Sequence, residues 1–259
     1  MPRLIKNRQP HELRGMQVDA DADTPTIYMY DVIGPSWAGM IDDQLFVDAL
    51  EQIGDAPEIM LRINSPGGDV FKASTIYNLL RDHAAAITVR IDGVAASAAS
   101  LIAMAGDRIE IASNAMVMIH QCSTIAWGNK DELRRATSML EKADTQAVQT
   151  YVDRTGGDKN TIIDWLQAET WFTADEAVEN GFADAKVGDV QNLKPAVPKG
   201  RFKNVPDVVE QYERTFPGMQ LAPPPPRPDA AGQTDADQPA QRHHHAAIAA
   251  RCRSVIASI

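Results

Sequence analysis

The chain has 259 residues, a formal net charge of −10 and a pI near 5.0. This length allows one sizeable core with appendages, and the acidity argues against nucleic-acid binding. Cys122 and Cys252 lie too far apart to indicate a disulfide framework or a metal site. The polar N-terminus lacks a signal peptide's apolar core, and no apolar run reaches the roughly 18 residues of a spanning helix. We therefore expect a soluble cytoplasmic protein with no cofactor, metal or membrane partner.

Between residues 25 and 190 the sequence alternates between strand and helix patterns. Aromatic and β-branched runs predict strands at 26–33, 58–63, 86–91, 108–111 and 115–120. Amphipathic spacing predicts helices at 42–53, 70–83, 97–105, 130–154, 160–166 and 174–180, and Asp42 is the expected N-cap of the first. Repeated strand–turn–helix units predict an α/β core with mainly parallel strands.

The composition changes near residue 195. Ten of the sixteen prolines follow Lys194, and they include a run at 223–226. We therefore divide the chain into an N-terminal segment (1–24), a main domain (25–195) that needs nothing beyond residue 195, and a largely disordered tail (196–259). Within the tail, 221–242 is the predicted disordered linker. The three histidines at 243–245 fit the polar end of a linker better than a metal site.

Three short stretches carry residues suited to acyl-transfer chemistry. The first is the turn NSPGG at 64–68, where glycines permit positive φ and a close backbone approach. Ser97 follows GVAA at a strand-to-helix turn, where free N–H groups and the helix dipole favour an oxyanion. His120 ends an apolar run and can serve as a base. Each has a structural alternative: a tight turn, a helix cap and a packed histidine. Ser100 has surroundings similar to those of Ser97.

A third residue must orient the imidazole. The pattern alone does not choose among the acids that follow, which are Asp153, Asp158, Asp164, Glu169, Asp175 and Glu176.

The order of the motifs resembles that of the ClpP serine peptidases over residues 25–190. The matching stretches are AGMIDD at 38–43, INSPGG at 63–68, AAS at 95–97, MIHQ at 118–121 and FTADEAVENG at 172–181. This resemblance implies a crotonase-like ββα superhelix that forms rings around a proteolytic chamber fed by an AAA+ unfoldase. It implies Ser97 as nucleophile, His120 as general base, and the N–H groups of Gly68 and Ala98 as the oxyanion hole. The long helix at 130–154 would then contribute to the contact between rings.

The chain departs from the family pattern in three places. Glu169 stands where the family has an aspartate, so Asp164 and Asp153 remain candidates for the third residue. The N-terminus shows no hydrophobic loop for an ATPase, and the proline-rich tail is additional. The last two features are similar to those of head-maturation proteases of tailed phages, whose partners would be capsid or scaffold proteins. A crotonase-type acyl-CoA hydratase or isomerase, and a non-catalytic ring or scaffold protein, are the competing functions.

Overall fold

The computed structural model describes residues 3–4, 15–190, 193 and 195–212. Among them, nine strands form one sheet, in the order β1-β2-β3-β4-β5-β6-β9 with β7 and β8 as a branch. The strands of this sheet are β1 (Arg3–Leu4), β2 (Gly15–Asp19), β3 (Thr26–Tyr30), β4 (Glu58–Ser65), β5 (Ala86–Ala96), β6 (Arg108–Ala112), β7 (Met116–Ile119), β8 (Thr170–Thr173) and β9 (Ala185–Val187).

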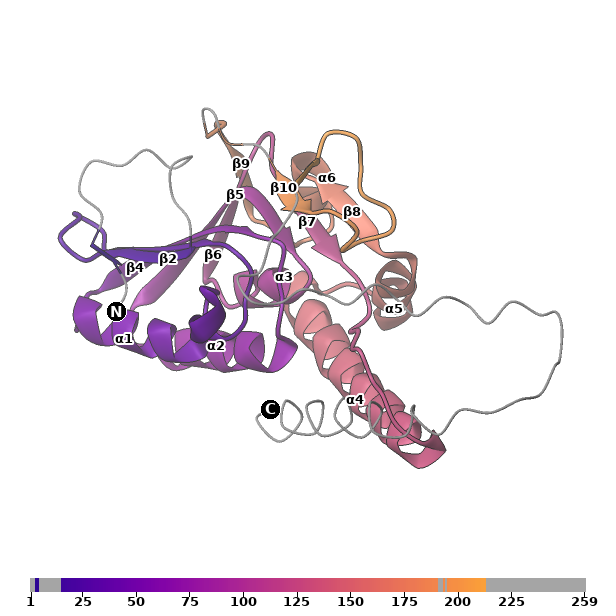
Figure 1. Ribbon diagram of the computed structural model, residues 1–259. Helices are drawn as coiled ribbons and strands as arrows, with labels where there is room; N and C mark the ends of the chain where they lie inside the picture. Colours follow the sequence, from indigo (N-terminus) through magenta and orange to yellow (C-terminus); the bar gives the residue numbers. More distant parts are fainter. Residues whose placement is uncertain (1–2, 5–14, 191–192, 194, 213–259) are drawn as a thin grey trace, which may run out of the picture. The chain divides into compact units, whose positions relative to one another are not determined.

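The helices follow the strands in alternation, as expected, and Figure 1 shows α1 and α2 side by side below the strands. They are α1 (Asp43–Ile53), α2 (Val70–Asp82), α3 (Ala98–Ala103), α4 (Lys130–Thr155), α5 (Lys159–Ala168) and α6 (Ala174–Glu179), with a short 3-10 turn, η2 (Ser36–Ala38). The predicted α/β class is confirmed, because β3, β4, β5, β6 and β9 are parallel. Asp42 caps α1 by accepting from the backbone N–H of Gln44. No helix in the described ranges is both long and apolar enough to cross a membrane.

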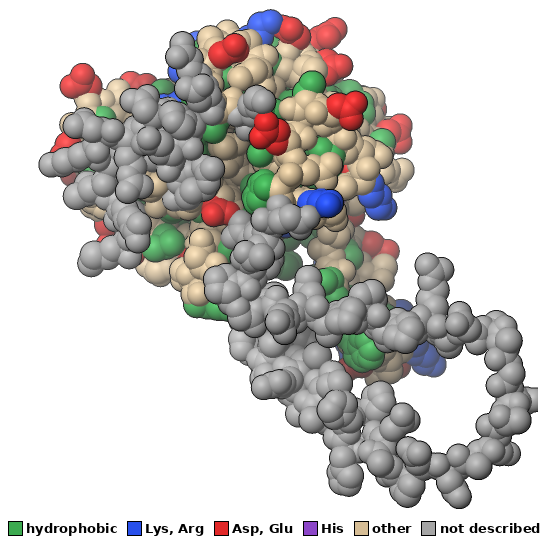
Figure 2. Space-filling view, turned by 45° about the horizontal axis from the view of Figure 1, so that its top comes forward, with side chains coloured by type: hydrophobic (Ala, Val, Ile, Leu, Met, Phe, Trp, Pro, Cys, Tyr) green, Lys and Arg blue, Asp and Glu red, His purple; other side chains and the backbone are tan. Residues whose placement is uncertain are grey.

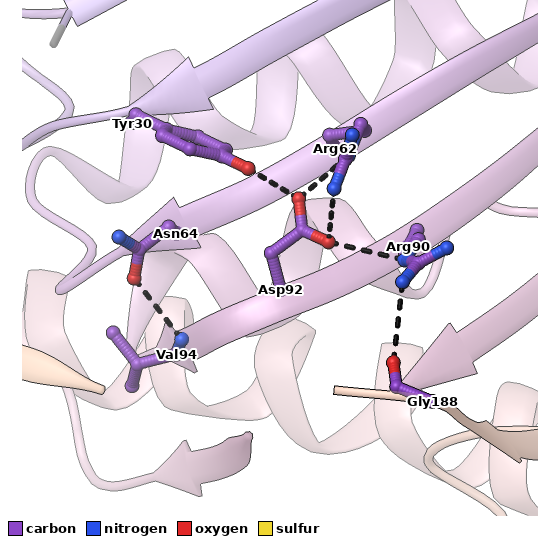
Figure 3. Close-up of polar contacts among 7 residues, drawn as sticks. All are labelled: Tyr30, Arg62, Asn64, Arg90, Asp92, Val94 and Gly188. Atoms are coloured by element: carbon purple, nitrogen blue, oxygen red, sulfur yellow. Dashed lines mark hydrogen bonds and ion pairs between the residues drawn. The ribbon is translucent and has the colours of Figure 1, made fainter. Parts of the chain in front are cut away.

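Alternation along β4 and β5 gives the sheet two different faces. Ile59, Leu61 and Ile63 are fully buried in the main core, which also contains residues of α1 and α2. The opposite face carries a polar cluster around Asp92, shown in Figure 3. Arg62 donates two hydrogen bonds to the Asp92 carboxylate at 2.7 and 2.8 Å, and Arg90 donates a third at 3.1 Å. The Tyr30 hydroxyl donates another. The fully buried Asp92 charge is thereby paired, which a buried charge requires.

Two parts of the chain join the packed body although the sequence placed them outside it. Strand β2, in the expected N-terminal segment, pairs antiparallel with β3 and buries Val18. Beyond residue 195, β10 (Ala196–Pro198) and β11 (Glu210–Tyr212) pair in parallel. We call residues 196–212 the strap. Its side chains Val197, Phe202 and Val209 are buried in a cluster with residues of β5 and β7. The packed body therefore extends past the boundary expected at residue 195. The predictions for 221–242 and 243–245 concern residues outside the described part.

Helix α4 projects from the body (Figure 1), and only Ala147, Val148 and Tyr151 near its C-terminal end are buried. Large apolar side chains are exposed along α4 and the stretch before it, namely Ile125 (97%), Trp127 (84%), Leu133 (44%) and Met139 (41%). On the face that Figure 2 draws, acidic side chains are spread widely and the basic ones form no continuous patch.

Candidate active site

The pairing of β5 with β7 brings Ser97 and His120 together. The two strands are parallel, with Ala96 opposite Met118, and the Ser97 N–H donates to the Met118 carbonyl at 2.8 Å. Because the strands are parallel, the residues that follow β5 and β7 emerge at the same end of the pair. The Ser97 Oγ lies 2.7 Å from the His120 Nε2, which is hydrogen-bonding distance.

Ser97 occupies a strained backbone conformation between β5 and α3. Its φ is 55° and its ψ is −128°, which costs a non-glycine residue about 1–3 kcal/mol. It is the N-cap residue of α3, but its side chain makes no capping hydrogen bond. The structural alternative of a simple helix cap is thus contradicted. The strained turn instead directs the hydroxyl toward the imidazole.

Ser100 has a different environment from Ser97. Its side chain is fully buried, and its hydroxyl bonds to the Ser97 carbonyl at 2.6 Å and the Tyr151 hydroxyl at 2.8 Å. Ser100 therefore connects α3 to α4 and supports the backbone of Ser97, rather than facing the imidazole.

The glycine turn lies directly against Ser97. A Cβ placed on Gly67 would be 2.4 Å from the Ala96 carbonyl oxygen and 2.8 Å from the Ala98 nitrogen, so only glycine fits. Gly68 forms a parallel bridge with Ile33, in which the hydrogen bonds are made by the Gly67 carbonyl and the Asp69 N–H. The N–H of Gly68 therefore points away from Ile33. The Ala98 N–H belongs to the first turn of α3, where a helix leaves its N–H groups unpaired.

The antiparallel pairing of β7 with β8 places one of the six candidate acids across from His120. Ile119 is opposite Thr170, so the same register places Glu169 across from His120. The Glu169 charge is the strongest charge acting on the imidazole and raises the pKa of His120. Asp153 and Asp164 are exposed on α4 and α5, and Asp153 accepts from Gln149. The other candidates have roles elsewhere: Asp158 and Glu176 cap helices, and Asp175 pairs with Lys186.

The hydrogen bonds found for the Glu169 carboxylate come from the strap. The backbone N–H groups of Lys203 and Asn204 donate to its Oε1 at 2.7 and 2.6 Å. Phe202 of the strap meets the His120 ring edge-on, with the ring centres 5.5 Å apart. These contacts were missed from the sequence, because a loop inside a proline-rich tail carries no periodic signal.

Burial has the largest effect on the imidazole and lowers the pKa of His120 below its ordinary value of 6.5. Arg201 and Lys203 lower it further, whereas the carboxylates of Glu169 and Asp144 raise it. Burial thereby favours the neutral imidazole, the form that can accept a proton. Asp144, like the strap residues, was not among the site residues predicted from the sequence. It accepts from the Cys122 N–H at 2.6 Å.

The sequence is similar to those of several bacterial peptidase subunits. It is 26% identical over 200 residues to the ATP-dependent Clp protease proteolytic subunit 1 of Protochlamydia amoebophila strain UWE25, covering 75% of this chain and 96% of that protein. It is 31% identical over 157 residues to the ATP-dependent Clp protease proteolytic subunit of Ligilactobacillus salivarius strain UCC118, covering 60% of this chain and 78% of the relative.

The model of the family described as Clp protease matches residues 19–189. This range contains the glycine turn, Ser97, His120 and Glu169 together with strands β5, β7 and β8, which bring them together. It ends before the strap begins. Because this model matches more than half of the chain, the chain belongs to the Clp protease family.

Proposed function

We propose that this protein is a serine endopeptidase that uses Ser97, His120 and Glu169. The observation that carries the proposal is the 2.7 Å contact between Ser97 Oγ and His120 Nε2, made by a serine in a strained turn beside two glycines. A packed structural serine has no need of this conformation, as Ser100 illustrates. Membership of the Clp protease family supports the same reaction.

In this mechanism, His120 Nε2 takes the Ser97 proton while Oγ attacks the peptide carbonyl carbon. The N–H groups of Gly68 and Ala98 stabilise the negative charge that forms on the carbonyl oxygen. The imidazolium then gives its proton to the leaving amine, and an acyl-enzyme remains on Ser97. A water molecule, deprotonated by His120, hydrolyses this ester and restores the serine. Glu169 stabilises the imidazolium form through its negative charge.

Covalent labelling tests this function against its two competitors. A fluorophosphonate probe should modify the full chain at Ser97, whereas the Ser97→Ala variant should remain unlabelled. A crotonase-type acyl-CoA enzyme and a non-catalytic ring protein share the fold but have no activated serine. Absence of labelling of the wild-type chain, with its fold shown intact by circular dichroism, would contradict the peptidase proposal.

We further propose that the protein assembles into homo-oligomeric rings through α4 and the stretch before it. The exposed apolar side chains of Ile125, Trp127, Leu133 and Met139 would be buried in such a contact. The full chain should therefore sediment as a large oligomer, and Trp127→Glu should shift it to smaller species. Trp37, 83% exposed on η2, provides the control, since Trp37→Glu should leave sedimentation unchanged. A monomer that still cleaves peptides would contradict this proposal.

The proposed substrates are proteins or peptides, and the proposed partner is an AAA+ unfoldase, because the relatives are named ATP-dependent. The capsid-maturation alternative makes a different prediction. In that case, portal and major capsid genes should neighbour this gene, and proteolysis should proceed without ATP.

A further inference from the structure

We propose that the strap, residues 196–212, is a positioning element of the active site. Its backbone N–H groups hold the Glu169 carboxylate in place, and the Phe202 ring packs against the His120 imidazole. The inference rests on the proposed peptidase function for its role in catalysis. The contacts that carry it are made by residues beyond the matched family range of 19–189.

The first step concerns the carboxylate. Glu169 sits at the C-cap of α5 with a φ of 52°, a conformation that a glutamate rarely adopts. The N–H groups of Lys203 and Asn204 both donate to Oε1, and we call this pair of hydrogen bonds the clamp. Oε2 takes no part in it. The Asn204 side-chain amide also donates to the Ala168 carbonyl at 2.9 Å. The Glu169 side chain has one more rotatable bond than aspartate, and these hydrogen bonds restrict it. An acid that orients an imidazole requires such a restricted side chain.

The second step concerns the imidazole. Phe202 is 7% exposed, lies edge-on to His120 and packs against Trp171 with ring centres 5.7 Å apart. Val197 and Val209 anchor the strap on the apolar side chains of β5 and β7, the strands that position Ser97 and His120. Because these anchors are buried, the strap is part of the packed site rather than a cover that substrate displaces.

The third step concerns charge. The charged groups that act most strongly on His120 are Glu169 and Asp144, which favour its protonation, and Arg201 and Lys203, which oppose it. Arg201 and Lys203 belong to the strap, and Glu169 is held by it. Burial, to which Phe202 contributes, has the largest effect. The strap therefore controls both the orientation and the protonation of the site.

An NMR titration of the full-length chain tests the contact with His120 without requiring activity. The chain has six histidines, so the His120 signal is assigned by its loss in His120→Gln. Phe202→Ala should admit water and raise the pKa of His120 toward its ordinary value, because burial is what lowers it most. Phe202→Leu, which keeps an apolar side chain, should restore most of the wild-type value. Val208 is 68% exposed, so Val208→Ala should leave the pKa of His120 unchanged. An unchanged pKa in a folded Phe202→Ala protein would overturn this part of the proposal.

The clamp is tested by removing one N–H. Asn204→Pro should lower kcat for a small peptide on the order of 10- to 100-fold with a smaller change in KM. Asn204→Ala keeps the N–H and should lose less. In Glu169→Gln, the additional loss from Asn204→Pro should nearly disappear, because both changes act through one side chain. Fully additive losses, or increased activity in Asn204→Pro or Phe202→Ala, would show that the strap does not position the site. Failure of the fluorophosphonate probe to label the wild-type chain would contradict the peptidase function. The NMR titration would still show whether Phe202 contacts His120.

Discussion

Replacing Ser97 with alanine is expected to reduce kcat for peptide hydrolysis by about 10⁴-fold or more. Alanine fits the space of serine but has no nucleophile for His120 to activate. The strained backbone is retained, because the Ser97 N–H bond to Met118 and the glycine turn do not depend on the hydroxyl. Turnover of a fluorogenic peptide, measured at matched oligomer concentration, checks the result.

Ser100→Ala is the matched control for this substitution. It should lower stability, because the Tyr151 hydroxyl loses a buried partner at a cost of about 1–3 kcal/mol. At temperatures where the protein is folded, it should nevertheless lose far less turnover than Ser97→Ala, because the nucleophile and its contact with His120 remain. Activity that survives Ser97→Ala and is lost in folded Ser100→Ala would assign the nucleophile to the other serine.

Replacing Glu169 with glutamine is expected to reduce kcat on the order of 10²- to 10⁴-fold. Glutamine keeps the size of the side chain, and its carbonyl can still accept from the N–H groups of Lys203 and Asn204. The main change is therefore the loss of the charge that stabilises the imidazolium. Because this charge raises the pKa of His120, its removal should lower that pKa. The acid limb of the kcat/KM profile should then move to lower pH.

Two comparisons make this prediction specific. Arg201 acts in the opposite direction on His120, so Arg201→Gln should move the acid limb to higher pH. Asp164→Asn and Asp153→Asn change exposed carboxylates and should leave the profile as it is. Full activity in Glu169→Gln, with a large loss in one of the aspartate variants, would transfer the orienting role to that aspartate.

Much of the fold could be read from local patterns. The strands at 58–63 and 86–91 and the helices at 42–53 and 70–83 were found because burial on one face imposes a period of 2 or 3.6 on the sequence. Strands β8 and β9, of four and three residues, are too short for such a period to appear. The N-terminal β2 is also short, and it is specified mainly by its partner β3.

For the site, the sequence by itself determined the residue types, since a Pro-Gly-Gly turn, a serine at a helix start and a histidine ending an apolar strand are local features. Three matters were decided only by the tertiary structure. Burial against Tyr151 separates Ser100 from Ser97. The register of β7 with β8 places Glu169, one of the six acids, across from His120. The strap reaches the site from residues 196–212, beyond the boundary expected at residue 195. Each depends on contacts between residues distant in sequence, and a local pattern of polar or apolar side chains does not encode which distant residue it will meet.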